Sequence, residues 1–77
     1  IVDEGARKAL LNKKSLLSVG VIGVEGSFES GDIATVVAPG NLQIGIGKVN
    51  VSSKILYQIK GKRYDKEVIH RDNIVIL

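Results

Sequence analysis

Apolar residues are patterned most clearly in the middle of the chain, in two adjacent segments. Residues 33–38 form a nearly continuous apolar run, which is typical of a strand buried on both faces. Every second residue of 42–47 is leucine or isoleucine, which predicts a strand with one buried face. Pro39-Gly40-Asn41 between them is a turn signal, so we predict a β-hairpin.

Shorter apolar segments predict further strands. Ile1-Val2 is expected to end one strand, residues 21–28 to form another, and residues 67–70 and 74–77 to form two short ones. The turns Ser30-Gly31-Asp32 and Arg71-Asp72-Asn73 separate these segments from their successors. Glycine recurs at every third residue from Gly20 to Gly26, which does not fit the strand period of two. We therefore expect these glycines to mark bends or close approaches.

Two segments have helical spacing. Asp3 is expected to cap a helix with Ala6, Ala9 and Leu10 on its inner face, and Asn12 to end it. Gly5 in its first turn is expected to allow the close approach of another backbone. Ser52 or Ser53 is expected to begin a second helix, which Gly61 ends. The inner residues of that helix are predicted to be Ile55, Leu56 and Ile59.

The order of these elements predicts the fold class. Strand, helix, strands, helix and strands follow one another within 77 residues, a length that makes one domain over residues 1–77. Many short strands and two short helices indicate a mainly β protein, a small closed or nearly closed barrel with helices at its ends.

Composition narrows the function classes. The chain has no cysteine, which excludes disulfides and cysteine-based zinc sites. No apolar run approaches the roughly 18 residues of a membrane span, so we expect a cytoplasmic protein without a membrane partner. The chain has no methionine and starts at Ile1, which indicates a fragment of a longer protein. Its net charge of +3 permits contact with phosphates but does not demand it.

Gly45-Ile46-Gly47-Lys48 invites comparison with a phosphate-binding loop. A Walker loop ending there needs glycine at position 42 and Ser or Thr at 49, where the chain has Leu42 and Val49. A dinucleotide fingerprint needs glycine at 50, where Asn50 stands. We expect these glycines instead to thin one face of a strand so that another element can pack on it. The GxxG matches at 20–23 and 23–26 lie in an apolar segment, so we discount a KH-type loop.

His70 is the single histidine and has no partner for a metal site. Arg71 and Asp72 could orient it, but a His-Asp pair without a nearby nucleophile does not define nucleophilic catalysis. We expect a polar turn between two strands, and we assign no catalytic, cofactor-binding or metal-binding residues.

Basic residues near the first and second helices could contact phosphates if they converge. Their alternative interpretation, which we favour, is an ordinary solvated surface. Base stacking would need exposed aromatics, and Tyr64 is the good candidate, because Tyr57 is expected to be half-buried and Phe28 to lie in the core. The basic set is Arg7, Lys8, Lys13, Lys14, Lys60, Lys62 and Arg63.

Several motifs together resemble the PUA domain, a small β pseudo-barrel. They are Asp3-Glu4-Gly5-Ala6 with Ala9-Leu10, Ser15-Leu16-Leu17-x-x-Gly20-Val21, and Gly26-x-Phe28-x-x-Gly31-Asp32. The last two are shared by tRNA pseudouridine synthases, archaeosine transglycosylases and glutamate 5-kinases. The closing Glu67-Val68-Ile69-His70-Arg71-Asp72-Asn73 is more specific and resembles the C-terminal end of bacterial glutamate 5-kinases, as do Asn50-x-Ser52-Ser53 and Lys60-Gly61-Lys62. The segment from Lys62 to Glu67 is shorter than in those kinases.

The resemblance implies a non-catalytic module, regulatory or structural, of an enzyme that phosphorylates L-glutamate with ATP for proline synthesis. ATP and magnesium would belong to an N-terminal amino-acid-kinase domain of the same chain, and this fragment would hold no cofactor. That domain is the expected partner, with a second copy of the chain as a further one.

The alternative is an RNA-binding PUA module of a tRNA- or rRNA-modifying enzyme. PUA relatives bind RNA through the first helix and the neighbouring surface, which by analogy implies the positions Arg7, Lys8, Lys13, Lys14 and Ser15.

Overall fold

The central and final apolar segments form one antiparallel sheet in the computed structural model, which describes residues 1–77. Its strands are β1 (Ile33–Ala38), β2 (Leu42–Lys48) and β3 (Ile74–Ile76), in the order β1-β2-β3. The predicted hairpin is confirmed: β1 and β2 pair from Ile33↔Lys48 to Ala38↔Leu42. Gly40 and Asn41 close it with φ values of 84° and 65°, in the left-handed region that these two residue types tolerate.

A bulge in β2 changes which side chains face the core. Val36 pairs with Gly45 while Val37 pairs with Gln43, so Ile44 has no partner on β1. Because one extra residue reverses the alternation, Gly45 and Gly47 turn inward beside the buried Ile44. The predicted strict alternation is therefore wrong, and Leu42 and Ile46 lie on the exposed side.

β1 also differs from the prediction of a strand buried on both faces. Ile33 is 66% exposed, whereas Val36 and Ala38 are buried. The reason is that the sheet is covered on one side only, as is common for antiparallel sheets.

Both predicted helices are confirmed. α1 spans Glu4–Leu11, and the Asp3 carboxylate caps it by accepting a hydrogen bond from the Ala6 N–H at 2.7 Å. Asn12 is its C-cap. α2 spans Ser53–Ile59 and is capped by the hydroxyl of Ser52, which accepts from the Ile55 N–H at 3.3 Å.

Three of the predicted strands shrink to single bridges. Ile1-Val2 and residues 21–28 form one isolated bridge, Val2↔Val21, and residues 67–70 form one isolated bridge with the rest of the chain, Leu16↔Ile69. Residues 22–28 follow an irregular path, with Gly26 at a φ of 74°. A strand needs a partner over several residues, and these segments have one for a single pair.

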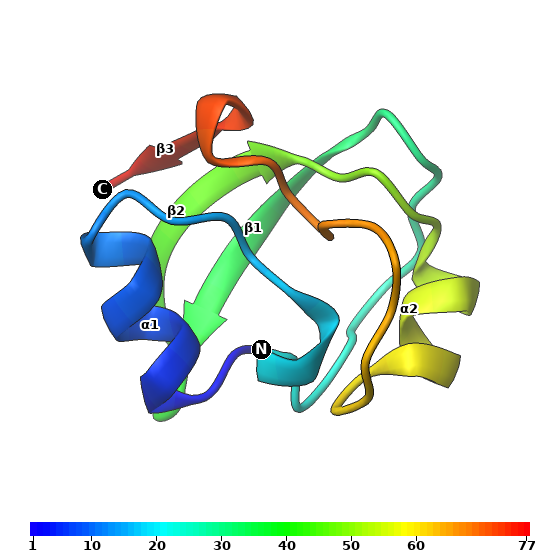
Figure 1. Ribbon diagram of the computed structural model, residues 1–77, viewed down its shortest axis with the longest axis horizontal. Helices are drawn as coiled ribbons and strands as arrows, with labels where there is room; N and C mark the ends of the chain where they lie inside the picture. Colours follow the sequence, from blue (N-terminus) through cyan, green and yellow to red (C-terminus); the bar gives the residue numbers. More distant parts are fainter.

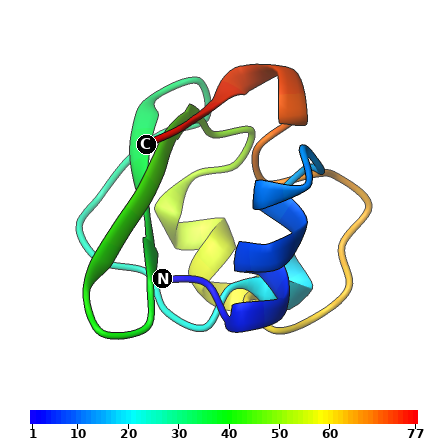
Figure 2. The same ribbon diagram turned by 90° about the vertical axis from the view of Figure 1, so that its left-hand side faces the viewer.

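The two helices lie at opposite ends of the molecule, with the hairpin between them (Figure 1). Turned by 90°, the sheet lies on one side and both helices on the other (Figure 2). The core between them consists of twelve buried hydrophobic residues, none aromatic: Val2, Leu10, Leu16, Val21, Val36, Ala38, Ile44, Val49, Val51, Leu56, Val68 and Ile69. Phe28 is partly buried and packs against this core.

Two 3₁₀ turns, Ser18–Gly20 and Arg71–Asn73, complete the structure. None of its helices has the length and hydropathy that a membrane span requires.

Candidate functional site

The residues predicted to contact RNA do not act as one set. Arg7 is half-buried on α1, and its guanidinium lies 3.5 Å from the Glu4 carboxylate of the same helix. Lys8 is exposed in the last turn of α1. Lys13 and Lys14 follow the helix and are exposed, with Lys13 at a φ of 60°. Pairing with Glu4 makes Arg7 less available to a phosphate than the lysines.

Ser15 and Lys14 instead meet the C-terminal segment. The backbone N–H of Arg71 donates a hydrogen bond to the Ser15 hydroxyl at 2.9 Å, across 56 positions of sequence. Lys14, Ser15, Glu67, His70 and Arg71 line one open surface hollow. The structure therefore places Lys14 and Arg71 around one hollow, although no local pattern in the sequence marks Arg71 as a site residue.

His70 organises the turn beside this hollow. Its Nδ1 accepts a hydrogen bond from the Asp72 N–H at 3.1 Å. Its Nε2 lies 3.9 Å from the Glu67 carboxylate and its Nδ1 lies 3.6 Å from that of Asp72. The predicted polar turn is thus confirmed, as the 3₁₀ turn that precedes β3. No cluster of three or more metal-ligating side chains forms anywhere in residues 1–77.

The aromatic side chains differ from the prediction at one position. Tyr57 is 61% exposed, because Leu56 is the residue of α2 that enters the core. The ammonium of Lys60 lies 4.4 Å from the centre of the Tyr57 ring. Tyr64 is exposed, as predicted.

Gly45 and Gly47 lie inside β2 and do not form a loop. A Cβ added at Gly45 would lie 2.8 Å from the carbonyl oxygen of Val75, and one at Gly47 would lie 2.8 Å from Ile69. The prediction that these glycines thin a strand face for packing is confirmed. Because neighbouring chain fills the space beside them, they cannot cradle a phosphate.

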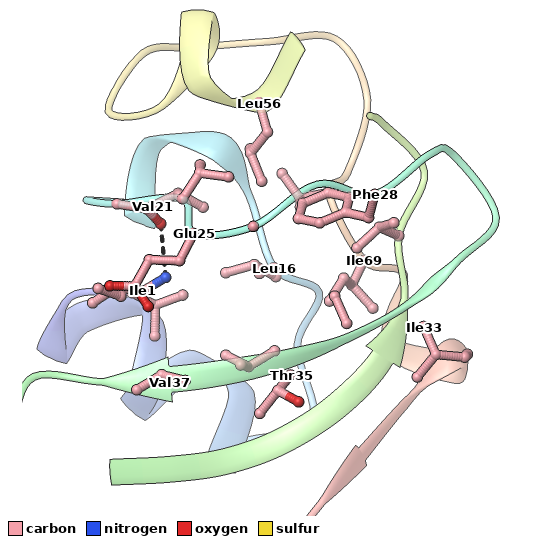
Figure 3. Close-up of a pocket in the computed structure, with 18 of the residues that line it drawn as sticks. Ile1, Leu16, Val21, Glu25, Phe28, Ile33, Thr35, Val37, Leu56 and Ile69 are labelled. Carbon is pink, nitrogen blue, oxygen red and sulfur yellow. Dashed lines mark hydrogen bonds between the residues drawn. The ribbon is translucent and has the colours of Figure 1, made fainter. Parts of the chain in front are cut away.

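An apolar hollow of the domain has a volume of about 350 Å³. It lies between residues 21–28 and β1, with Leu56 of α2 and the core residue Leu16 at its inner side (Figure 3). Glu25 and Ser27 are its polar lining residues on the side of residues 21–28, whereas the side chain of Thr35 on β1 points away from it (Figure 3). This arrangement supplies no activated nucleophile and no acid–base pair, but it offers an apolar binding surface.

The amino group of Ile1 lies at this hollow and donates a hydrogen bond to the Gly23 carbonyl at 2.7 Å (Figure 3). Burial lowers the pKa of this group below its usual value of 8.0, and the nearby Glu25 carboxylate opposes the shift.

The PUA domain family model matches residues 1–71, which is most of the chain. The chain belongs to the PUA domain family. The PUA domain from Aeropyrum pernix, solved as a tartrate complex, superposes with a TM-score of 0.81 at 32% identity, covering 91% of this chain and 39% of that one. A PUA protein from Thermoplasma acidophilum shares the fold, with a TM-score of 0.76 at 24% identity over 99% of this chain and 44% of that one. The predicted fold class, a mainly β pseudo-barrel with two short helices, is confirmed.

This PUA domain is also similar to part of the glutamate 5-kinases. It is 44% identical to the enzyme of Aquifex aeolicus over 86 positions and 45% identical to that of Caldanaerobacter subterraneus over 89. Each match covers 99% of this chain but only 24% of the kinase, in its C-terminal region. The chain thus spans about a quarter of the length of these relatives. Both alignments exceed the 77 residues of the chain, so the kinases contain residues that it lacks.

Proposed function

We propose that this PUA domain is a non-catalytic, regulatory or structural module of a glutamate 5-kinase, which phosphorylates L-glutamate with ATP in proline biosynthesis. The observation that carries the proposal is the match itself, which takes up nearly the whole domain and only a quarter of the kinase. The cytoplasm is the compartment in which we place this enzyme.

The geometry of the domain supports the division of labour. Its glycine pair is packed against β3 and Ile69, and the hollow beside residues 21–28 is apolar. ATP and magnesium would therefore be held by an N-terminal kinase domain of the longer chain, and this module would act on that domain without touching the reacting phosphate.

The outer face of the sheet supports contact with such a partner. Thr35, Ile46 and Val75 are cross-strand neighbours on this face, and Val75 is 60% exposed. Monomeric proteins rarely leave large contiguous apolar surfaces in water. The kinase domain of the same chain is the partner that we propose for this face, with a second copy of the module as the alternative.

Deleting residues 1–77 from the full-length kinase tests the proposal. We expect the truncated enzyme to keep measurable glutamate phosphorylation, while its inhibition by proline or its dependence on magnesium changes. The control is full-length enzyme carrying Lys54→Glu, a substitution on the exposed side of α2. Identical proline and magnesium responses in the full and truncated enzymes would overturn the proposed role.

RNA binding is the second candidate, and the convergence of Lys14 and Arg71 on one hollow favours it. Lys13, the neighbour of Lys14, lines an adjacent hollow that also includes Arg71. The carboxylates of Glu67 and Asp72 lie at the same two hollows. Contacts with phosphate would give salt-dependent affinity without reading sequence.

A gel shift with tRNA over a series of salt concentrations tests this candidate. Binding should weaken linearly on a log–log scale, and Lys13→Glu with Lys14→Glu should reduce both the affinity and the slope. The matched control is Lys54→Glu with Lys62→Glu, which changes the net charge equally at the other end of the domain. Absence of retention at low salt, or equal loss in both double variants, would exclude a specific RNA site here.

A further inference from the structure

Strand β3 forms one edge of the sheet and has a partner on one side only. It pairs with β2 from Gly47↔Ile74 to Gly45↔Ile76, and β2 separates it from β1 (Figure 1). Proteins commonly protect such an edge with a charged residue, a proline or a bulge. Residues 73–77 read Asn-Ile-Val-Ile-Leu and pair with β2 in regular register, so none of these devices is present. The edge is therefore able to pair with a further strand.

The backbone groups that face away from β2 can be assigned from one hydrogen bond. The Leu77 N–H donates to the Ile44 carbonyl at 3.0 Å, so the backbone groups of Leu77 face β2. Successive residues of an antiparallel strand direct these groups alternately towards and away from a neighbour. Val75 consequently faces β2 as well, whereas the N–H and carbonyl groups of Ile74 and Ile76 point out of the sheet at its edge.

This set of outward groups is complementary to itself. When two copies of β3 lie antiparallel with Val75 opposite Val75, Ile74 of each copy lies opposite Ile76 of the other. Each such pair can exchange both of its hydrogen bonds, because the groups of both residues point towards the other copy. Every outward group of the edge then has a partner, and the two copies are related by a twofold axis at Val75.

The side chains fit the same arrangement. Val75 is 60% exposed on the outer face, and at the axis it would meet its own copy in a non-hydrogen-bonded pair, in which side chains come closest. Ile74 and Ile76 lie on the inner face, beside a hollow that Leu10 of α1 also lines. The isoleucines of a second copy would lie over this hollow and cover Ile76, which is 37% exposed.

The charged residues near the edge do not oppose this pairing. Arg71 and Asp72 line the same hollow and directly precede β3, together with Asn73 of the turn. Because the axis passes through Val75, Asp72 of one copy would lie about six residues along the strands from Asp72 of the other, roughly 20 Å away. Like charges of the two copies therefore stay apart.

We propose that the edge of β3 is an interface between two copies of this chain, which pair antiparallel about a twofold axis at Val75 and join their sheets into one. A second copy is favoured over an unrelated strand, because the same edge supplies a partner for every outward group. Two short strands bury less than the roughly 1,600 Å² of a standard interface, so the dimer is reversible. The inference is independent of the kinase assignment, and the added strand lies beside the sheet without covering its outer face.

Disulfide trapping tests the proposal, since the chain has no cysteine of its own. Val75→Cys places two thiols opposite each other at the axis, where the Cα separation of a non-hydrogen-bonded pair suits a disulfide. The controls are Ile33→Cys, at a residue that is 66% exposed on β1, and Ile46→Cys, on β2. The measurement is the rate at which each variant forms a disulfide-linked dimer with oxidised glutathione, divided by the rate at which its thiol reacts with a small disulfide reagent.

We expect Val75→Cys to form the linked dimer about tenfold or more faster than either control. N-methylation of Ile76 in the Val75→Cys chain should reduce its rate to that of the controls, because the methyl group blocks an outward N–H and leaves the pairing with β2 intact. Equal rates in the three cysteine variants would overturn the interface. An equally fast Ile46→Cys would overturn it in favour of contact between the faces of two sheets, and an unchanged rate after N-methylation would rule out pairing through the backbone.

Discussion

Gly20 brings the 3₁₀ turn at residues 18–20 against α1 more closely than any side chain would permit. A Cβ added there would lie 2.6 Å from the Cβ of Ala6. Gly5, which the sequence suggested as the close-approach position, is exposed, and a Cβ on it would lie 3.4 Å from the Asp3 carboxylate. The close approach is thus made by the glycine of the turn and an alanine of the helix.

Gly20→Ala should therefore lower the free energy of unfolding by about 1–3 kcal/mol, because the methyl group overpacks the contact with Ala6. Gly5→Ala is the matched control and should raise it by about 0.5–1 kcal/mol, because alanine favours the helix and finds space. Urea denaturation of both variants gives the two values. A neutral or stabilising Gly20→Ala would contradict this packing.

The amino group of Ile1 makes a prediction about pH. Its pKa is lowered in the folded chain by burial, so between that lowered pKa and 8.0 the unfolded chain binds more protons. The stability of residues 1–77 should therefore rise with pH across this window and level off above it. Urea midpoints at several pH values should show a rise that is absent when Ile1 is acetylated. The same pH dependence in both forms would contradict this assignment to the Ile1 amino group.

Local chemistry at single residues was predictable, whereas contacts between distant residues were not. Asp3 as a cap and the packing role of Gly45 and Gly47 follow from residue type and spacing. The bond between Ser15 and Arg71 depends on how the whole chain returns on itself, and neither residue carries a local sign of it.

The sequence predicted correctly those elements whose signals lie within the element itself or directly beside it. α1, α2 and the hairpin each have a cap, a helical period or a turn signal within a few residues. Residues 21–28 have the composition of a strand, but their pairing depends on a distant segment that meets them at one residue. The bulge at Ile44 was likewise invisible, since apolar residues on alternate positions suit either face of the sheet.

Helix α1 should depend measurably on its cap. Asp3→Ala removes the acceptor for the Ala6 N–H and should lower the free energy of unfolding by about 1 kcal/mol. Asp3→Asn keeps a capping oxygen and should retain most of that stability. Chemical denaturation of the two variants measures the difference. Equal destabilisation by Ala and Asn would mean that the charge of Asp3 matters and its cap does not.

At the scale of the whole molecule, one part of the sequence indicates the fold family and another part indicates the enzyme to which the domain belongs. The glycines and Phe28 between Ser15 and Asp32 are characteristic of the PUA fold, which several classes of enzyme share. The closing segment Glu67–Asn73 pointed to glutamate 5-kinases, and it forms the turn that joins Ser15 to β3 in the structure. The hollow beside Ile1 could not be predicted. Residues 21–28 were expected to form a strand, but in the structure they follow an irregular path and leave the hollow between themselves and β1.

The central claim is that this PUA domain belongs to a glutamate 5-kinase. An activity assay of the full polypeptide that contains residues 1–77 tests it most directly. With ATP, magnesium and L-glutamate, we expect ADP release that depends on glutamate. Absence of that activity, together with pseudouridine formation on tRNA by the same polypeptide, would contradict the account and assign this PUA domain to an RNA-modifying enzyme.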